Sequence, residues 1–310
     1  MNILVTGGIG FIGSYFSSKL CKNAENNIQV IDNFTGHSES GLKFLKKQQN
    51  VQIHDVDIVK DNLDKFFKNI DIVYHFAANS KISQGVNNAD IDFEISAVGT
   101  HRILKSMTNN EVKHILYTSG SGVYGDQKEL ELSEEFGPSL PVSFYGASKL
   151  CAEAYISSFV GMKGMKASIF RFANVVGFRQ THGVVYDFFH KLKKDPRNLH
   201  VLGNGLQSKS YIDVEDIFNA VELVKQKQTK NVDVFNVATQ DYITVRDIAE
   251  IVVERMRLET SIYYQEQSEG WIGDVPVIRF NTNKLRTLGW QNSLSSRAAI
   301  IHAIDNLIKE

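Results

Sequence analysis

The chain has 310 residues, of which 43% are hydrophobic and 22% are charged, and this composition is typical of a globular protein with one large or two modest domains. Its 34 basic and 35 acidic residues nearly cancel, so the charge gives no reason to expect a nucleic-acid partner. No apolar run approaches the roughly 20 residues that span a bilayer, and no apolar leader precedes the first predicted strand. The two cysteines, Cys21 and Cys151, have no motif spacing and suit a reducing compartment. We expect a cytoplasmic protein without a membrane partner or a metal site.

Strand-like and helix-like segments alternate through the first half of the chain. Short apolar runs predict strands, and apolar positions at helical spacing predict the helices between them. The predicted strands are 2–6, 28–32, 51–54, 71–76, 113–118 and 167–172, and the predicted helices are 11–22, 40–48, 61–68, 90–109 and 145–162. This alternation predicts an α/β fold of the Rossmann type with a doubly wound parallel sheet.

After about residue 174 the alternation becomes irregular. The segments expected there are a helix over 183–194, a glycine-rich stretch over 202–209, a helix from about 214, a strand over 232–237 and a helix over 244–256. We expect a smaller C-terminal substrate-binding lobe made of 175–206 and 240–310, packed on a Rossmann domain made of 1–174 and about 207–239. Because ligands of such sheets bind beyond the carboxyl ends of the strands, the cleft should lie between the two.

The first strand runs directly into a glycine-rich turn with G-x-x-G-x-x-G spacing. Gly7, Gly10 and Gly13 let the backbone approach a pyrophosphate, and the helix that follows points its free N–H groups, from Phe11 and Ile12 onward, at the anion. The spacing departs from the G-x-G-x-x-G fingerprint, and many strand-to-helix turns use glycines for packing alone. The turn nevertheless favours a dinucleotide.

The second predicted strand ends in Asp32, about 20 residues after the glycine turn. A carboxylate at this place accepts hydrogen bonds from the ribose hydroxyls of the adenosine half and repels a 2′-phosphate. The alternative is an ordinary turn residue within Asp-Asn-Phe-Thr-Gly. Together with the glycine turn, Asp32 favours NAD over NADP.

Tyr145 and Lys149 lie four residues apart near the start of a predicted helix and therefore share one face. A nearby ammonium lowers the pKa of a phenol, which could then remove a proton from a sugar hydroxyl while hydride leaves the same carbon. Such a pair is common on ordinary helices, and only the dinucleotide turn upstream makes it a catalytic candidate. Ser119 and Ser121 follow a predicted strand, where a hydroxyl can align the reacting oxygen or simply form a turn.

These segments together resemble the extended short-chain dehydrogenase/reductase family, in its branch of NAD-dependent sugar-nucleotide epimerases and dehydratases similar to UDP-glucose 4-epimerase. The resemblance runs the length of the chain. Its segments are Thr6 to Gly13, Asp32-Asn33, Asp55 to Ile58, His75 to Ala78, Ser119 to Gly125, Tyr145 to Lys149, Arg171 to Asn174, Gly203 to Asp216, Gly273 to Pro276 and Leu288 to Trp290.

The resemblance implies roles for further residues. Cofactor contacts are implied for Asn33, Asp57, Ile58, Ala77, Ala78 and Thr118, beside Tyr145 and Lys149, and substrate contacts for Lys81, Ser83, Asn174, Lys209 and Tyr211. A homodimer through the helices near 90–109 and 145–162 is also implied. We interpret His75 as a core histidine at a strand end.

Departures from the family pattern are as informative as the matches. The usual catalytic Ser or Thr is Gly120 here, so either flanking serine could supply the hydroxyl. The Asp-Glu pair of the 4,6-dehydratases is replaced by Ser121-Gly122, which argues against dehydration. Lys209 and Glu269 stand where nucleotide-binding arginines are usual, and Ser96 replaces an asparagine that backs the cofactor.

The resulting expectation is NAD-dependent oxidation of a nucleotide-diphosphate sugar at C4 through a 4-keto intermediate, as in a sugar-nucleotide 4-epimerase. One alternative is a net 4-dehydrogenase or reductase, for example on a GDP-sugar or GDP-heptose of surface-polysaccharide synthesis. A remoter one is a non-catalytic NAD-binding protein. Residues 81–95, 175–190 and 260–280 should line the sugar pocket, and no motif among them names the base or the sugar.

Overall fold

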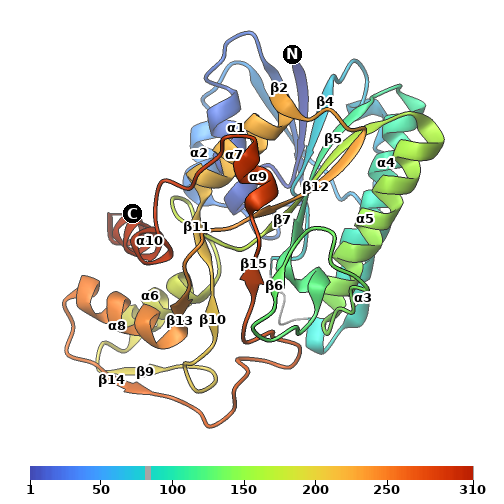
Figure 1. Ribbon diagram of the computed structural model, residues 1–310. Helices are drawn as coiled ribbons and strands as arrows, with labels where there is room; N and C mark the ends of the chain where they lie inside the picture. Colours follow the sequence, from blue (N-terminus) through green and yellow to red (C-terminus); the bar gives the residue numbers. More distant parts are fainter. Residues whose placement is uncertain (81–84, 310) are drawn as a thin grey trace.

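A seven-stranded parallel sheet forms the centre of the computed structural model, which describes residues 1–80 and 85–309 (Figure 1). The strands lie in the order β12-β7-β5-β4-β1-β2-β3, so the order reverses between β1 and β4. Their bounds are β1 Asn2–Thr6, β2 Asn27–Asp32, β3 Val51–Asp55, β4 Ile72–His75, β5 His114–Gly120, β7 Lys166–Phe172 and β12 Val232–Val237. The predicted Rossmann-type α/β fold is confirmed.

Helices cover both faces of this sheet (Figure 1). On one face α1 (Phe11–Leu20), α2 (Glu39–Leu45) and α7 (Val214–Lys227) contribute Phe16, Leu45 and Val221 to a core cluster shared with β1. On the other face α4 (Gly99–Asn109) and α5 (Phe144–Lys163) contribute Leu104 and Ile156 to a second cluster. The strands are therefore buried from both sides, which explains their continuous apolar runs.

Two predicted helices are wrong in their extent. The segment 61–68 forms only a 3₁₀ turn over Asp64–Phe66, because the Asn62 side chain accepts a hydrogen bond from the Asp64 N–H and Asn69 adopts φ 60°. The segment 90–109 is divided into α3 (Ala89–Asp92), a π-helical turn η3 (Phe93–Val98) and α4.

A third core cluster joins α6 (Val184–Lys194), α8 (Val245–Met256) and α10 (Ser296–Lys309). These three helices lie on the left side of Figure 1. The pair β9 (Asn198–His200) and β14 (Ser261–Tyr263) accompanies these helices. The segment with β15 (Arg279–Phe280) and α9 (Asn283–Thr287) contributes instead to the first cluster, through residues such as Phe280 and Leu285. The division into 1–174 with 207–239, and 175–206 with 240–310, stays a prediction.

Three more short strand pairs, which the sequence patterns did not indicate, connect distant segments. They are β6 (Glu131–Leu132) with β15, β8 (Asn174–Val176) with β11 (Tyr211–Asp213), and β10 (Ser208–Lys209) with β13 (Ile243–Thr244). Each is two or three residues long, too short for a periodic signal. Two of them place side chains at the site described below.

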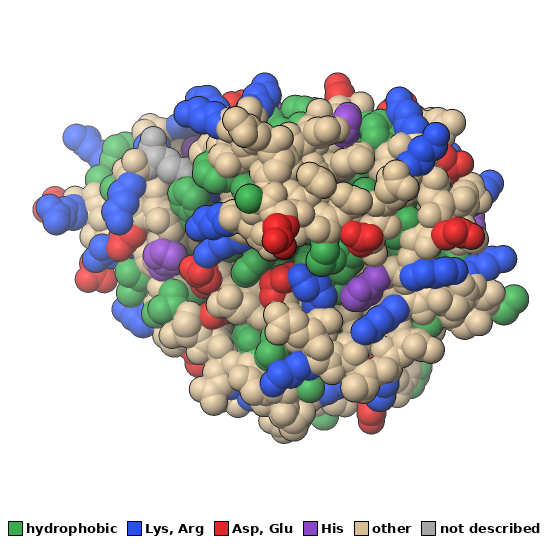
Figure 2. All heavy atoms as spheres, turned by 90° about the horizontal axis from the view of Figure 1, so that it is seen from above, with side chains coloured by type: hydrophobic (Ala, Val, Ile, Leu, Met, Phe, Trp, Pro, Cys, Tyr) green, Lys and Arg blue, Asp and Glu red, His purple; other side chains and the backbone are tan. Residues whose placement is uncertain are grey.

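The surface agrees with the near-zero net charge. On the face seen from above, acidic and basic side chains are interspersed (Figure 2). Over the described residues, none of the helices combines the length and the apolar character needed to cross a membrane.

Candidate active site

A cavity of about 1020 Å³ opens at the carboxyl ends of the central strands and extends to the third core cluster. Gly7 of the turn after β1 and Ala77 after β4 both line it, so it spans the point where the strand order reverses. This is the position where open α/β sheets bind their ligands. Its far wall includes Phe188 of α6 and Val245 of α8.

The glycine turn leaves one end of the cavity lined by bare backbone. Gly7 has φ +64°, and a Cβ there would lie 2.7 Å from the backbone nitrogen of Ala77. A Cβ on Gly13 would lie 2.1 Å from the carbonyl oxygen of Gly7. Gly10 is the N-cap of α1 and offers no side-chain cap, so the first N–H groups of the helix face the cavity. Such a cradle fits a pyrophosphate.

Asp32 lies at the end of β2, beside this cradle, and is 9% exposed. Its carboxylate accepts hydrogen bonds from the N–H groups of Ile9 (3.2 Å) and Phe34 (2.9 Å). Burial raises the pKa of Asp32, and these two hydrogen bonds oppose the rise. A carboxylate held in this way is oriented to accept from ribose hydroxyls, so the residues present fit an adenosine ribose.

All of the predicted cofactor residues line the same cavity: Gly7, Gly10, Phe11, Ile12, Gly13, Asp32, Asn33, Asp57, Ile58, Ala77, Ala78 and Thr118, together with Tyr145 and Lys149. The structure therefore brings this set together, while the role of each member stays a prediction. The Thr118 hydroxyl is engaged, because it donates to the carbonyl oxygen of His75.

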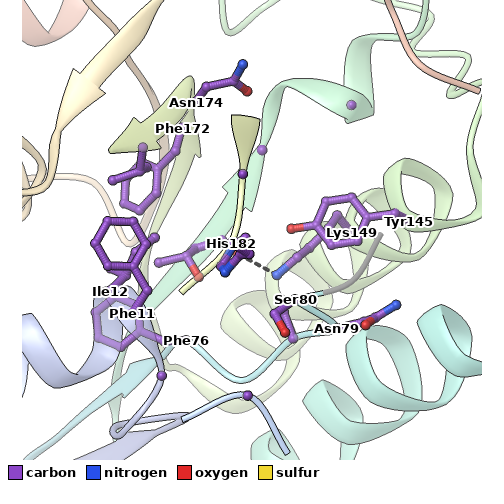
Figure 3. A pocket seen from close by; sticks show the side chains of 18 of the residues that line it. Phe11, Ile12, Phe76, Asn79, Ser80, Tyr145, Lys149, Phe172, Asn174 and His182 are labelled. Atoms are coloured by element: carbon purple, nitrogen blue, oxygen red, sulfur yellow. Dashed lines mark hydrogen bonds between the residues drawn. The ribbon is translucent and has the colours of Figure 1, made fainter. Parts of the chain in front are cut away.

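Tyr145 and Lys149 project from the first turns of α5 into the cavity (Figure 3). The helix begins here because the Ser143 side chain caps it by accepting from the Gly146 N–H (3.1 Å). The Lys149 ammonium is buried, donates to the carbonyl oxygen of Thr118 (2.8 Å), and lies 5.7 Å from the centre of the Tyr145 ring. A Cβ on Gly146 would lie 2.4 Å from the carbonyl oxygen of Gly122, so this glycine lets the tyrosine approach the serine loop.

The expected lowering of the Tyr145 pKa is not found in the protein without ligands. Burial raises the pKa of Tyr145 to about 12, and the carboxylate of Asp92 acts in the same direction. Burial also lowers the pKa of Lys149 to about 8. Desolvation of the phenolate therefore outweighs the neighbouring ammonium, and a further positive charge close to the ring would be needed to favour phenolate.

The two candidate serines differ in their surroundings. The Ser119 hydroxyl is buried and donates to the Glu153 carboxylate (2.5 Å), which also forms an ion pair with Arg171 (2.7 Å). Both serines line the cavity, and the Ser121 hydroxyl has no hydrogen-bond partner among the described residues. Between them, a Cβ on Gly120 would meet nothing within 4 Å. Ser121 is therefore the hydroxyl available to a ligand.

At the opposite end of the cavity, strands from distant parts of the chain bring the predicted substrate residues together. Asn174 and Tyr211 are direct neighbours in the β8·β11 pair. Burial raises the pKa of Tyr211, opposed by a hydrogen bond with the Asn174 side chain. Lys209 on β10 forms an ion pair with Asp274 (2.5 Å) inside the cavity. Lys81 and Ser83 lie outside the described residues.

With this geometry in place, comparison with known proteins gives the family. The family model described as GDP-mannose 4,6 dehydratase matches residues 4–297. The chain belongs to this family.

Known proteins also match this chain over nearly their whole length. A putative UDP-glucose 4-epimerase of Methanocaldococcus jannaschii is 29% identical over 308 residues, which cover 98% of this chain and 97% of the relative. A crystal structure of UDP-galactose 4-epimerase is 31% identical, with a TM-score of 0.89 and coverage of 100% and 99%. The UDP-glucose 4-epimerase of Thermus thermophilus, solved as a complex with NAD, is 27% identical, with a TM-score of 0.87 and coverage of 99% of each chain.

These findings confirm the predicted resemblance to the extended short-chain dehydrogenase/reductase family. The chain is an NAD-dependent enzyme of the sugar-nucleotide epimerase and dehydratase class, as the sequence indicated.

Several other lining residues were anticipated only as parts of broad ranges. Gln180 and His182 enter the cavity from the loop between β8 and α6, and Trp271 and Asp274 enter from the loop before β15. Gly177, Gly183 and Gly273 all have positive φ angles. Glycines in the sequence indicate turns at these positions, but they do not indicate that the loops reach the cavity. Asn79 and Ser80 follow the Ala-Ala turn after β4 and could have been inferred from that position.

His75, at the end of β4, is a core residue, as interpreted from the sequence. It is fully buried, and its ring nitrogens hydrogen-bond with the hydroxyls of Thr6 (2.6 Å) and Thr100 (2.9 Å). Burial lowers the pKa of His75 to about 3, so the ring is neutral. It supports the turn after β4 from inside the sheet.

Proposed function

We propose that this protein is an NAD-dependent sugar-nucleotide 4-epimerase, which oxidises a nucleotide-diphosphate hexose at C4 and reduces the 4-keto sugar on its other face. The observation that carries the proposal is the position of Tyr145 and Lys149. They lie in one cavity with a phosphate cradle at one end and the Asn174, Lys209 and Tyr211 cluster at the other.

The cofactor end would hold NAD through the turn from Gly7 to Gly13 and through Asp32. NAD bound there would supply the hydride acceptor and donor for C4 and, in its oxidised form, a positive charge. The buried carboxylate of Asp32 favours NAD over NADP, because a 2′-phosphate beside it would be repelled. Asp57, Ile58 and the Ala77-Ala78 turn would contact the adenine and ribose parts.

The chain's own residues then provide the acid–base chemistry. Tyr145 takes the proton from the C4 hydroxyl as the hydride leaves and gives it back when the carbonyl is reduced. Because burial holds the pKa of this phenol at about 12, its ionisation depends on Lys149 and on the positive charge of the ligand. Ser121 donates a hydrogen bond to the reacting oxygen, while Ser119 keeps Glu153 in place.

Epimerisation is favoured over loss of water by the loop after β5. Elimination of water needs an acid and a base besides the tyrosine, and the residues that this loop presents to the cavity, from Ser119 to Gly122, are serines and glycines without a carboxylate. The nearby Glu153 is buried in its ion pair with Arg171 and does not line the cavity. The described residues around Tyr145 therefore suit a reversible oxidation at one carbon.

Nucleotide-sugar binding is assigned to the other end of the cavity. Asn174 and Tyr211 would contact the diphosphate, and Lys209 would supply one positive charge. Because Asp274 already neutralises Lys209, the ligand competes for this ammonium. UDP-glucose and UDP-galactose are the first substrates to test, since the two structural relatives described above are a UDP-galactose 4-epimerase and a UDP-glucose 4-epimerase.

A coupled assay tests the proposal. Purified enzyme is incubated with UDP-, dTDP- and GDP-hexoses while absorbance at the wavelength of reduced nicotinamide and product NMR are recorded. The proposal expects a C4-inverted sugar without net NADH. Accumulation of NADH together with a keto sugar would instead identify a net 4-dehydrogenase, and turnover unchanged in Tyr145→Phe would refute the assignment of the base.

We further propose a homodimer through the face formed by η3, α4 and α5. Phe93, Tyr155 and Met162 are exposed apolar side chains there, with 55%, 45% and 80% of their surfaces accessible. Light scattering tests this arrangement: we expect a dimer for the natural protein and a monomer for Met162→Lys.

We also propose a cytoplasmic location, which the two free cysteines, Cys21 and Cys151, support.

A further inference from the structure

The loop from residue 177 to 183, between β8 and α6, reaches across to the phosphate cradle. Its course is fixed by Gly177 (φ 127°), Arg179 (φ 69°) and Gly183 (φ 94°), three positive φ angles in seven residues. The Arg179 guanidinium donates to the carbonyl oxygen of Ser14 in α1 (2.9 Å) and lies over the ring of Phe44. The loop is therefore held against the cofactor side of the cavity.

Gln180 is a buried polar residue with unused hydrogen-bonding capacity. It is 3% exposed and lines the cavity. Its side-chain nitrogen donates to the carbonyl oxygen of His182 (2.7 Å), which fixes the orientation of the amide. Its oxygen, Oε1, is buried and has no partner among the described residues. An unpaired buried acceptor is costly, so this position calls for a donor from a ligand.

His182 presents a second unused group to the same space. Its ring packs edge-on against Phe11, the first residue of α1, with ring centres 6.2 Å apart at 82°. Nδ1 pairs with the Thr181 hydroxyl (3.1 Å). In the view of Figure 3, His182 lies between Phe11 and Ile12 on one side and Lys149 on the other. Although the residue is open to the cavity, desolvation by the surrounding walls lowers the pKa of His182, which favours the neutral ring. If the Thr181 hydroxyl donates to Nδ1, Nε2 carries the proton and acts as a donor toward the cavity.

We propose that this loop is a second clamp on the cofactor, in which His182 Nε2 donates to a pyrophosphate oxygen on the N-terminus of α1 and Gln180 Oε1 accepts from a hydroxyl of the nicotinamide ribose. The clamp is supplied by the segment that leads into α6, whereas the cradle comes from α1. It would link the two walls of the cleft through the cofactor and slow its release between the two hydride transfers. The inference rests on the NAD-binding part of the proposed function.

Phosphate could come from NAD or from the sugar nucleotide, and the contact with Phe11 favours NAD. The test is therefore direct binding, independent of turnover. Affinities for NAD, ADP-ribose, ADP and UDP are measured by calorimetry on protein freed of bound cofactor. His182→Phe keeps the aromatic packing and removes the donor, and His182→Gln keeps a donor. His190→Phe makes the same exchange on α6, at a residue that does not line the cavity.

For His182→Phe we expect the affinity for NAD and ADP-ribose to fall by about tenfold or more, as for loss of a hydrogen bond to a charged group, with the affinity for UDP unchanged. His182→Gln and His190→Phe should bind NAD within about twofold of the natural protein, a difference below that of a typical hydrogen bond. Gln180→Met should weaken ADP-ribose more than ADP, because ADP lacks the second ribose.

Unchanged NAD affinity in His182→Phe, or a loss confined to UDP, overturns the clamp. If His182→Phe does not fold, NMR of the natural protein provides the test. Addition of ADP-ribose should change the ¹⁵N chemical shift of His182 Nε2, and an unchanged chemical shift would refute the proposal. Natural protein that binds no NAD at all would refute the proposed function itself, a result distinct from selective loss in the variant.

Discussion

The two ends of the cleft are built in different ways. The predicted cofactor end is built around a phosphate cradle whose residues, Gly7, Gly13 and Asp32, lie close together in the sequence and present mostly backbone atoms. The proposed sugar end is assembled from Asn174, Lys209 and the loop around Asp274, which approach only through tertiary folding.

The two ends differ in how much side-chain change their packing allows. A backbone cradle tolerates almost no side-chain change, since a Cβ on Gly13 would lie 2.1 Å from a carbonyl oxygen. At the sugar end, a Cβ on Gly120 would meet nothing within 4 Å, and Lys209 is balanced by a carboxylate that could be exchanged. Substitutions should therefore act on cofactor binding at one end and on KM or rate at the other.

The largest effect is expected where the two ends meet. Tyr145→Phe removes the phenolic hydroxyl and keeps the ring, so kcat should fall by about 10³-fold, within the range for a general acid–base group. NAD affinity should stay unchanged, which calorimetry checks alongside steady-state rates. Activity within about tenfold of the natural enzyme would contradict the role of Tyr145 as the base.

The cradle is tested by a matched pair of glycine substitutions. Gly13→Ala should reduce NAD affinity by about 100-fold or more, since a loss of this size needs only about 3 kcal/mol and its methyl group must displace the backbone of the turn. Gly161→Ala is the control, because a Cβ on this α5 glycine meets nothing within 4 Å, and alanine should slightly stabilise the helix. Equal NAD contents in the two purified variants would break the proposed contrast between the ends.

Alanine substitutions at Ser121 and Ser119 should have different effects, the first on kcat and the second on the free energy of unfolding. Ser121→Ala is expected to lower kcat by about 10- to 100-fold, as for loss of one hydrogen bond to a charged oxygen, without changing the melting temperature. Ser119→Ala removes a donor to the buried Glu153 and should instead destabilise the fold by about 1–3 kcal/mol, measured by denaturant unfolding. The reverse pattern would move the catalytic hydroxyl to Ser119.

The smallest effect is expected at Lys209. Because Asp274 already neutralises Lys209, replacing the two together, Lys209→Met with Asp274→Asn, leaves no unpaired carboxylate and should raise KM for the sugar nucleotide by only about three- to tenfold, with kcat unchanged. Lys128→Met is the control, since its partner Asp126 lies outside the cavity. A fall in kcat without a change in KM would place Lys209 near the reacting carbon rather than at the phosphates.

The contrast between the ends also explains what the sequence could predict. The cradle was predictable because Gly7, Gly13 and Asp32 act through neighbours in one strand–helix–strand unit. The use of Ser119 was not, because its partner Glu153 lies 34 positions along the chain and pairs with Arg171 on another strand. Likewise, the pKa of Tyr145 depends on burial in the folded protein and on the carboxylate of Asp92. The four-residue spacing between Tyr145 and Lys149 gives no information about either effect.

We propose that C4 of a sugar nucleotide is oxidised and then reduced again while the same NAD molecule stays bound to the enzyme. The most direct measurement is NMR of the product formed from UDP-glucose deuterated at C4. We expect UDP-galactose that retains the deuterium at C4, with no NADH released to solution. Loss of the label to solvent, or a stoichiometric yield of NADH and keto sugar, would contradict it.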